Sequence, residues 1–364
     1  MGIECQWYYV NCAEDIVPAS WNAALASQLT DTELASVQSY VFRKDQERSL
    51  LSILLQKYVI KKYLTAVMAD SASPQLPAQE EELFHISRTR ENKPYLVVTS
   101  ESVADLVASR GDTFNYNVSH HGDFVGIVSH THLLMGMDLV DVSTRASWVD
   151  SLKEYIDIYK KQLSDKEVET ILTCSTEEKC YTHFYVLWSL KEAYVKAVGV
   201  GIGIDLKKVE FDVTYTSQEV TSAPTAAGAV TEYQVSPGGR SSSVCGTAVL
   251  RLMGELEGHD GWQFEFFSLD GKHVMTVARG LPSSALAAFQ TAAWPSYSSS
   301  SDCRQLSEGC ALGLKKDTEA NINIDMNHAH HVIVCNSKSC HIHHNTFLRA
   351  QFPTLLTIDD LLVS

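Results

Sequence analysis

A glutamate and a lysine lie four residues apart in the segment WSLKEAYVKAVGVGIGID, which begins at Trp188. On a helix, Trp188, Glu192 and Lys196 share one face, so that a carboxylate and an ammonium lie beside an aromatic ring. Such a pair is usually a surface ion pair, which contributes about 0.2 to 0.5 kcal/mol. The glycines that follow would let the backbone approach a ligand closely. The spacing alone leaves both interpretations open.

A second carboxylate of interest is Asp138, in the β-prone run MGMDLVDV. An acidic residue in such a run most often marks an edge or a turn. Together with Glu192, Asp138 could instead give Mg²⁺ two carboxylates, while waters and substrate phosphate oxygens fill its other positions. Val140, on the same face of the strand, cannot add a third ligand. Asp141 points to the opposite face of a regular strand, so we expect it to be structural.

Two further motifs carry groups that donate to anions. Ser119 and His120 lie in NVSHHGD, and Arg88, Arg90 and Lys93 lie in the basic turn of RTRENK. A histidine beside a turn is usually a polar surface or capping group. Histidine and the basic side chains also donate to phosphate oxygens, so the two motifs together could line an anion site.

The C-terminal region holds a cluster of histidines and cysteines: His328, His330, His331, Cys335, Cys340, His341, His343 and His344. Such side chains could bind zinc. However, no pair in the cluster has the spacing, matched by a second pair, that is typical of a structural zinc site. We therefore favour a flexible polar insert.

Composition limits the classes of function. The chain has 364 residues, of which 45% are hydrophobic, and a formal net charge of −15. This charge argues against a broad attraction to nucleic acid or to anionic membranes, so an anionic ligand must be bound locally. No apolar run is long enough to span a bilayer, and the nine cysteines do not resemble a secreted framework. We expect a cytoplasmic monomer with reduced thiols.

The elements that must position these residues are indicated by periodicity. Residues 30–68 have helical spacing, and ELFHISRTRENKPYLVV predicts a strand, a basic turn and a strand. Three strands are expected in the run that starts at NYNVSHHGD. Residues 146–172 are helical in pattern, with Ser164 and Glu167 spaced as a capping box. A second capping box, Ser175 with Glu178, is expected before the helix that carries Glu192.

Later segments alternate as strands do: KKVEFDVTY, EYQVS, GTAVLRLM, WQFEFFSLD and KHVMTVARG. The fold class is therefore α+β (α/β), with two subdomains that each combine helices and a small sheet. We expect an N-terminal subdomain over residues 1–131 and a C-terminal subdomain with the metal site over residues 132–281. We expect residues 282–364 to form a partly disordered tail, whose last residues, FPTLLTIDDLLVS, are apolar enough to dock.

Three of these motifs occur in the order and at the rough distances of one family: NVSHHGDFVGIV, GMDLVDV and FYVLWSLKEAYVKAVGVGIGIDL. They resemble the signature segments of the Sfp-type 4′-phosphopantetheinyl transferases, and the last segment is the most specific. RTRENKPYL resembles the basic turn of those enzymes, and FPTLLTIDDLLVS resembles the end of their animal members. The resemblance covers residues 38–279 and these terminal residues.

The resemblance implies two similar subdomains related by a pseudo-twofold axis, with coenzyme A bound between them. The implied reaction moves the 4′-phosphopantetheine arm from coenzyme A to a serine of an acyl or peptidyl carrier protein, and adenosine 3′,5′-bisphosphate is released. The nucleophile would belong to the carrier, which agrees with the lack of a nucleophile among the motifs above.

The resemblance also implies roles for single residues. Asp138 and Glu192 would hold Mg²⁺ on the pyrophosphate of coenzyme A. Glu192, or a metal-bound water, would take the serine proton, and Lys196 would reach a pyrophosphate oxygen.

For the nucleotide, the family pattern places Ser119 and His120 at the 3′-phosphate end, with Asn117 in the same segment. Arg88 and Lys93, with the turn between them, would hold the same nucleotide.

The chain departs from the family pattern at several positions. Val140 stands where many bacterial members have a third acidic ligand, so water would complete the metal shell. His121 stands where animal members have an amide. An arginine that binds the nucleotide in animal members aligns near Ser36, so this contact would be lost or taken over by Arg43 or Lys44. The alternative function is a non-catalytic module that binds coenzyme A or a carrier protein.

Overall fold

The computed structural model describes residues 5–13, 18–69, 83–145, 149–199, 201, 204–216, 245–252, 255–256, 261–282, 314–316, 322–324, 354–356 and 361. The elements before residue 131 are β1 (Cys5–Asn11), α1 (Pro18–Ser27), α2 (Asp31–Gln38), α3 (Arg43–Ala69), β2 (Phe84–Arg88), β3 (Pro94–Val98), α4 (Glu101–Arg110), β4 (Asn115–His121) and β5 (Phe124–His130). Between residues 134 and 280 lie β6 (Leu134–Asp141), α5 (Leu152–Tyr159), α6 (Asp165–Leu172), α7 (Glu177–Val198), the 3₁₀ helix η3 (Leu206–Lys208), β7 (Val209–Tyr215), β8 (Cys245–Leu252), β9 (Glu255–Leu256), β10 (Trp262–Ser268) and β11 (His273–Gly280). Near the C-terminus lie β12 (Leu314–Lys316), β13 (Ile322–Ile324) and β14 (Thr354–Leu355).

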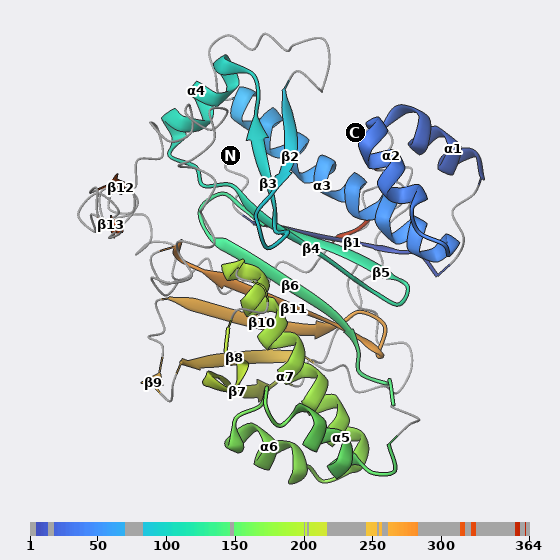
Figure 1. The fold of residues 1–364 in the computed structure, drawn as a ribbon, viewed down its shortest axis with the longest axis vertical. Coiled ribbons are helices and arrows are strands. Elements are labelled where there is room, and N and C mark those ends of the chain that lie inside the picture. The colour runs from blue at the N-terminus through green and yellow to red at the C-terminus, as the bar shows by residue number, and fades with distance from the viewer. Residues whose placement is uncertain are drawn as a thin grey trace, which may run out of the picture.

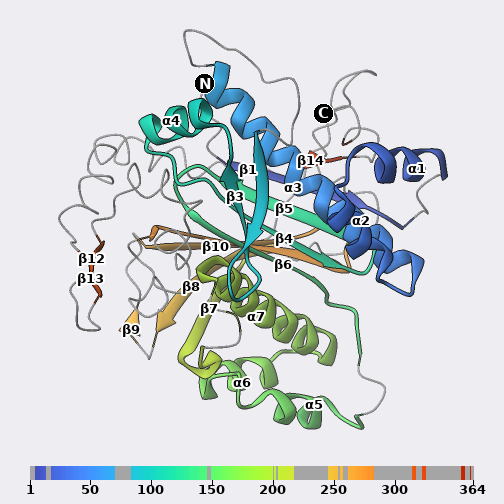
Figure 2. The same ribbon diagram turned by 45° about the horizontal axis from the view of Figure 1, so that its top comes forward.

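Two sheets lie in the middle of the molecule, and each is covered by one long helix (Figures 1 and 2). The first sheet has the order β14-β1-β5-β4, and α3 packs on its outer face. The second has the order β6-β11-β10-β8-β7, with β9 paired to β8, and α7 packs on its outer face. A third apolar cluster fills the space between the two sheets. The mixed α and β composition agrees with the predicted fold class.

The side chains of β6 alternate between two of these cores. Leu134 and Val140 belong to the cluster with α7, whereas Met135 and Met137 belong to the cluster between the sheets. Because successive side chains of a strand point to opposite faces, Asp138 lies on the face that is turned toward α7. β6 is also the edge strand of its sheet. The residue that could bind a metal is therefore on the edge strand, directly under the long helix.

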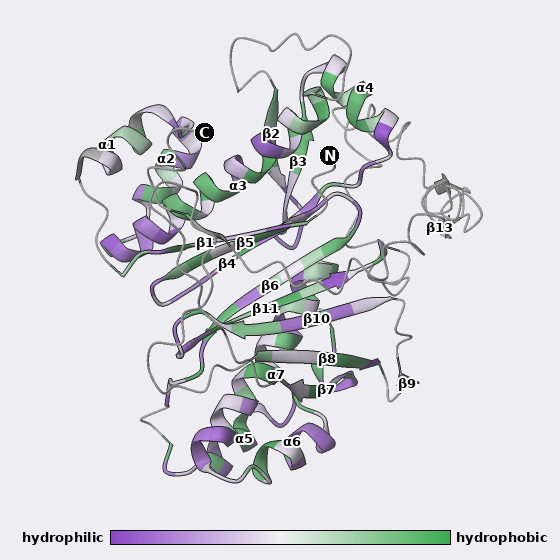
Figure 3. Cartoon of the chain, turned by 180° about the vertical axis from the view of Figure 1, so that it is seen from behind, coloured by the Kyte–Doolittle hydropathy of each residue, from purple (hydrophilic) through white to green (hydrophobic). Residues whose placement is uncertain are grey.

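Hydropathy follows the same layers. Figure 3 shows green, hydrophobic residues along β5 in the interior and purple, hydrophilic turns on the outer helices α5 and α6. Every residue of β5 is buried, which explains its almost continuous apolar sequence, FVGIVSH. Among the described helices, none is both long and apolar enough to cross a membrane.

Several sequence predictions are confirmed. The basic hairpin is present as β2 and β3, which pair from Phe84 with Val98 to Arg88 with Pro94. The three strands expected after it are β4, β5 and β6, and four of the later strands are β7, β8, β10 and β11. The predicted strand EYQVS lies outside the described residues, as does the cluster of histidines and cysteines at residues 328–344.

The helical pattern expected over 146–172, with a capping box at Ser164 and Glu167, corresponds to α5 and α6, and Ser164 is the N-cap of α6. Two local predictions are wrong. The helix expected over 30–68 is two helices, because α2 ends at Gln38 and α3 begins only at Arg43. The capping box expected at Ser175 is absent: Thr176 is the N-cap of α7, and its hydroxyl accepts a hydrogen bond from the Lys179 amide.

The end of the chain docks on the N-terminal sheet. Thr354 and Leu355 pair in parallel with Tyr8 and Tyr9 of β1. Leu356 and Leu361 are buried in the core beneath α3. The prediction that the last residues dock on the protein is therefore confirmed, and they close one edge of the first sheet. Most of the predicted tail, residues 282–364, lies outside the described part of the chain.

Candidate functional site

A row of polar side chains on β4 joins the two sheets. β4 and β6 are edge strands of different sheets, and no backbone ladder connects them in the described structure. Instead, the amide oxygen of Asn115 accepts a hydrogen bond from the Met135 N–H at 2.8 Å, and that of Asn117 accepts one from the Met137 N–H at 2.9 Å. Ser119 is the next residue on the same face of β4. Every second residue of NYNVS, namely Asn115, Asn117 and Ser119, therefore belongs to a polar seam between the two sheets.

At the end of this seam lies a compact charged cluster. The Nζ of Lys196 donates to Oδ1 of Asp138 at 2.6 Å and to Oγ of Ser119 at 3.1 Å. The Ser119 hydroxyl also donates to Asp138, at 3.4 Å. The side chain of Asp138 is 11% exposed and that of Lys196 is 30% exposed, so the pair is only partly open to solvent. The structure thus brings together three predicted residues from β4, β6 and α7.

Glu192 belongs to the same cluster through its charge. Burial raises the pKa of its carboxyl group, the positive charge of Lys196 lowers it, and the negative charge of Asp138 raises it. Within the described residues, no hydrogen bond or ion pair joins the Glu192 carboxylate to another side chain. The ion pair between Glu192 and Lys196, one of the two interpretations of their spacing, is therefore not formed. Lys196 pairs with Asp138 instead, and the Glu192 carboxylate has no partner among the described residues.

The site depends on a close approach of α7 to β6. A Cβ atom added to Gly136 would lie only 2.0 Å from the carbonyl oxygen of Ala193 and 2.4 Å from the amide nitrogen of Ala197. Only a glycine lets the two backbones come this close. The helix ends at Gly199, whose φ of 82° is left-handed. Glu192 and Lys196 are thereby held above the strand that carries Asp138.

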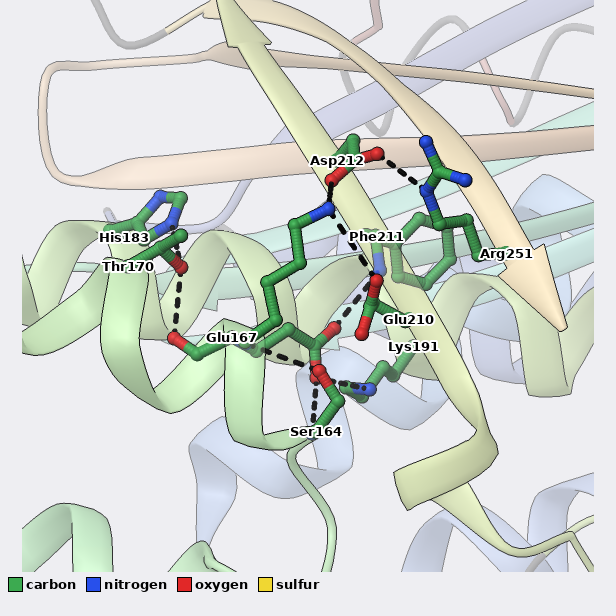
Figure 4. A network of polar contacts seen from close by, with 10 residues as sticks. Ser164, Glu167, Thr170, His183, Lys191, Glu210, Phe211, Asp212 and Arg251 are labelled. Carbon is green, nitrogen blue, oxygen red and sulfur yellow. Dashed lines mark hydrogen bonds and ion pairs between the residues drawn. The ribbon is translucent and has the colours of Figure 1, made fainter. Parts of the chain in front are cut away.

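The opposite side of α7 is anchored by a buried ion pair, drawn in Figure 4. Lys191 is fully buried, and its Nζ lies 2.8 Å from the Glu167 carboxylate. The same ammonium donates to the carbonyls of Leu206, at 2.9 Å, and Val209. Lys191 directly precedes Glu192, so its three partners fix the rotation of the helix about its axis.

Glu167 is satisfied as completely as Lys191. Its carboxylate accepts hydrogen bonds from the amides of Ser164, at 2.8 Å, and Phe211, at 3.0 Å, in addition to the ion pair. Burial raises the pKa of Glu167 and lowers that of Lys191, while their mutual attraction acts in the opposite direction on each. The predicted capping box of α6 is confirmed, and its glutamate also supports α7.

An exposed ion network lies next to this buried pair in Figure 4. Asp212 of β7 accepts from Lys166 of α6 and from Arg251 of β8, the latter at 2.7 Å. The side chain of Lys166 is 48% exposed, whereas that of Lys191 is 0% exposed. Lys166 of α6 and Lys191 of α7 are thus both paired with carboxylates, the first at the surface and the second in the core.

The last two residues of β4 are histidines that lie close to the cluster, each partly covered by its neighbours. Burial of the rings lowers the pKa of His120, and the charges of Arg48 and Lys196 lower it further. Burial also lowers the pKa of His121, while the charge of Asp138 raises it. His121 is therefore within electrostatic reach of the predicted metal site, and His120 lies near the cations Arg48 and Lys196 and the anion Asp45.

Arg48 was not predicted from the sequence. It lies on α3, and its Nη1 donates to the Gly122 carbonyl of the histidine turn at 2.6 Å. The predicted replacements for the missing arginine are placed elsewhere: Arg43 stacks on Trp21 at 3.4 Å, and the Nζ of Lys44 donates to the Cys12 carbonyl. The sequence did offer one signal for Arg48: it lies four residues after Lys44, so the two share one face of a helix.

The basic hairpin splits into an exposed and a buried part. Arg88 is exposed, and its Nη1 donates to the Asn92 carbonyl at 3.0 Å. Lys93 points inward, and its Nζ donates to the carbonyls of Met135, Lys196 and Ala197. Of the two predicted nucleotide ligands in this turn, only Arg88 presents its charge to solvent.

The carboxylates of Asp138 and Glu192 fit a magnesium ion. They are close enough for the charge of Asp138 to affect the pKa of Glu192. Two carboxylates, completed by waters and substrate phosphates, are a common set of ligands for Mg²⁺. No group of three or more His, Cys, Asp or Glu side chains suited to a metal occurs among the described residues. A site of this kind needs phosphate oxygens of the substrate as further ligands.

Comparisons with known proteins agree with the resemblance noted above. The family model "4′-phosphopantetheinyl transferase, N-terminal" matches residues 17–132, and the model "4′-phosphopantetheinyl transferase superfamily" matches residues 134–247. The matches meet between the end of β5 and the start of β6, where the chain passes from one sheet to the other.

Similar whole proteins are also found. The chain is 27% identical over 265 residues to L-aminoadipate-semialdehyde dehydrogenase-phosphopantetheinyl transferase of Rattus norvegicus, covering 73% of this chain and 71% of the relative. The Homo sapiens protein of the same name is 26% identical over 264 residues, covering 72% and 71%. A phosphopantetheinyl transferase of Thraustochytrium is 28% identical over 193 residues, covering 52% and 59%.

Proposed function

The chain belongs to the 4′-phosphopantetheinyl transferase superfamily, and on that basis we propose that Asp138, Glu192 and Lys196 form its reaction centre. The enzyme transfers the 4′-phosphopantetheine moiety of coenzyme A to a carrier protein. The observation that supports this centre is the cluster in which Lys196 contacts Asp138 at 2.6 Å while Glu192 keeps free oxygens. A non-catalytic module is not favoured, because such a module has no need of an unpaired, half-buried carboxylate.

The chemistry requires one bond to form and one to break. The oxygen of the carrier serine forms a bond to the phosphorus next to the pantetheine arm. The bond from that phosphorus to the bridging oxygen breaks, and adenosine 3′,5′-bisphosphate leaves with the electron pair. The serine proton moves to the carboxylate of Glu192, which acts as the general base.

Lys196 supplies positive charge at the reaction centre. In the free protein its ammonium is held by Asp138 and Ser119, which fix it on the face of α7 that Glu192 shares. We propose that it turns to a pyrophosphate oxygen when coenzyme A binds. Asp138 is then released from its ion pair and, with Glu192, would hold Mg²⁺. The ion would offset the negative charge of the phosphate groups during transfer.

The nucleotide end of coenzyme A is assigned to donors on β4, on α3 and on the basic hairpin β2–β3. We propose that Ser119, His120 and Arg88 contact it, with Arg48 in place of the arginine that the family pattern places near Ser36. Arg48 supports this assignment because its charge already acts on His120.

Asn117 takes part in the proposed site as a support. Its amide oxygen is occupied by the Met137 N–H, so the side chain holds β6 against β4 instead of presenting that oxygen to a ligand. The Asn117 side chain therefore places Ser119, two residues later, beside Asp138. We propose that Asn117 contacts coenzyme A only through polar groups other than this amide oxygen.

The partners and the organisation are further proposals. The acceptor is an acyl or peptidyl carrier domain, and the names of the relatives point to an aminoadipate-semialdehyde dehydrogenase as one candidate. The protein acts as a cytoplasmic monomer. The halves 1–131 and 132–281 are related by a pseudo-twofold axis, which is supported by one long helix on the outer face of each sheet. Superposition of the halves in an experimental structure and size-exclusion chromatography test these points.

A panel of apo carrier proteins tests the function. Purified protein is incubated with coenzyme A, Mg²⁺ and a fatty-acid synthase carrier, a mitochondrial-type carrier or an aminoadipate-reductase-type carrier. We expect at least one carrier to gain the mass of one phosphopantetheine group, and the gain to disappear when its acceptor serine is replaced by alanine. Binding of coenzyme A without a mass gain on any carrier would show that the chain is a non-catalytic module.

A further inference from the structure

Lys93 has a position that the proposed chemistry does not explain. The turn that carries it is closed by hydrogen bonds between Thr89 and Lys93: the Thr89 amide donates to the Lys93 carbonyl at 2.9 Å, and the Lys93 amide donates to the Thr89 hydroxyl at 3.1 Å. Asn92, in the turn, has a left-handed φ of 66°. This geometry directs the side chain of Lys93 into the protein, where the residue is only 8% exposed.

The ammonium group of Lys93 has three protons and three acceptors. The Nζ atom lies 3.1 Å from the carbonyl oxygen of Met135, 2.9 Å from that of Lys196 and 2.6 Å from that of Ala197. The last two carbonyls belong to the final turn of α7, where helical hydrogen-bond partners are missing and negative charge accumulates. A lysine offers only three donors, so none remains for a phosphate.

The three acceptors belong to the two elements that form the reaction centre. Met135 precedes Asp138 by three residues on β6, and Lys196 itself supplies one of the carbonyls on α7. Between them, at Gly136, the two backbones are too close to admit a Cβ atom. Lys93 enters this junction from the hairpin β2–β3 of the other half of the chain.

We propose that Lys93 is a positioning residue, which clamps the end of α7 to β6 and so sets the distance between Asp138 and the pair Glu192 and Lys196. The inference rests on the proposed function, because it concerns the same reaction centre. It gives the buried charge of this turn a structural role in the site, and it leaves Arg88 as the nucleotide ligand of the hairpin. Burial lowers the pKa of Lys93 to about 7, in agreement with an ammonium that has no carboxylate partner.

A comparison of Lys93→Met with Arg88→Ala tests this role. Displacement of catalytic groups by a fraction of an ångström slows a reaction without weakening remote contacts. We expect Lys93→Met to lower kcat at least about tenfold, with the KM for coenzyme A and the Kd for adenosine 3′,5′-bisphosphate within about twofold of wild type. Arg88→Ala should raise the KM and leave kcat unchanged. A Lys93→Met protein with a weaker affinity for the bisphosphate and an unchanged kcat would overturn the proposal.

A measurement on the unaltered protein covers the case in which Lys93→Met does not fold. Amine acylation followed by peptide mass spectrometry reports which ammonium groups are accessible. We expect Lys93 to be unreactive both without and with adenosine 3′,5′-bisphosphate, while Lys208, whose side chain is 60% exposed, reacts in both states. Acylation of Lys93 that the nucleotide suppresses would identify it as a nucleotide ligand and refute the clamp. Transfer by the wild-type protein is scored separately, so a failure of the proposed function is distinguishable from a failure of this inference.

Discussion

Two neighbouring residues of α7, Lys191 and Glu192, show how differently one helix can treat its charges. Lys191 is completely buried, and its ammonium has a carboxylate and two carbonyls as partners. Glu192 is half-buried, and within the described structure its carboxylate makes no hydrogen bond or ion pair. The first charge is fully compensated by the protein, and the second is left for a ligand.

The difference follows from what each side of the helix faces. The Lys191 side packs against α6 and the start of β7, where the capping glutamate Glu167 and the carbonyls of Leu206 and Val209 accept its protons. The Glu192 side faces β6, where the nearest carboxylate, Asp138, is already bound by Lys196. A buried charge without a partner costs stability and persists where function needs it. Both sides of α7 carry charged residues, but only on the functional side is a charge left without a partner in the described structure.

The largest effect is expected when the uncompensated charge is removed. Glu192→Gln keeps the shape of the side chain but cannot accept the serine proton or bind a cation well. We expect the rate of phosphopantetheine transfer to fall by about 10³-fold, as is typical when a general base that is also a metal ligand is lost. A mass assay on an apo carrier, run at saturating coenzyme A, measures this rate.

The same variant should retain its stability. The folded state raises the pKa of Glu192, so it binds this proton more tightly than the unfolded state. Stability is therefore lost as the pH rises and the group ionises, and a neutral glutamine removes that cost. Urea unfolding at pH 7 should give a free energy equal to or above that of wild type. A variant that is both active and less stable would reverse the roles assigned to the two faces.

The next largest effect concerns the compensated charge. Lys191→Met leaves the Glu167 carboxylate buried without its partner, so we expect the free energy of unfolding to fall by about 3 kcal/mol. Urea titration followed by circular dichroism measures the change. The double variant Lys191→Met, Glu167→Met should recover much of the loss, because no unpaired charge then remains.

Lys166 provides a matched control on the same network. It also pairs with a carboxylate, that of Asp212, but its side chain is 48% exposed. Lys166→Met should therefore change the free energy of unfolding by less than about 1 kcal/mol. Equal losses for Lys166→Met and Lys191→Met would mean that burial is not what separates these two lysines.

The smallest effect is a shift in titration. The positive charge of Lys196 lowers the pKa of Glu192, and the negative charge of Asp138 raises it. Lys196→Met should thus raise the pKa of Glu192, and Asp138→Asn should lower it. Nuclear magnetic resonance titration of the Glu192 carboxyl carbon in metal-free protein measures both shifts. Shifts of the same sign in the two variants would show that Glu192 is not between these charges.

Local signals in the sequence predicted local structure well. Ser164 and Glu167 were identified as a capping box, because the motif depends only on residues three apart. The break between α2 and α3 was missed, since the residues from 39 to 42 interrupt the helix without a proline or glycine to mark it. At the start of α7, Ser175 and Thr176 are both good caps, and the pattern selected the wrong one of two adjacent hydroxyls.

The candidate site was predicted in its residue types but not in its contacts. The spacing of Glu192 and Lys196 placed them on one face of a helix, which the structure confirms. That spacing suggested that they pair with each other, whereas Lys196 pairs with Asp138, which is 58 positions away. Arg48 was not found, because its proximity to the histidine turn arises from the packing of α3 on the first sheet.

The sequence by itself determined which groups are present and which side of each helix or strand they occupy, because helical and strand periodicities are properties of the local backbone. Only the tertiary structure decided which of these groups are already satisfied. Donors or acceptors within the protein already pair with the side chains of Asn117, Lys93 and Lys191. The Glu192 carboxylate has no such partner among the described residues. Hydrogen bonding is limited by the number of donors and acceptors, so a polar side chain that is already paired within the protein must give up a partner before it binds a ligand.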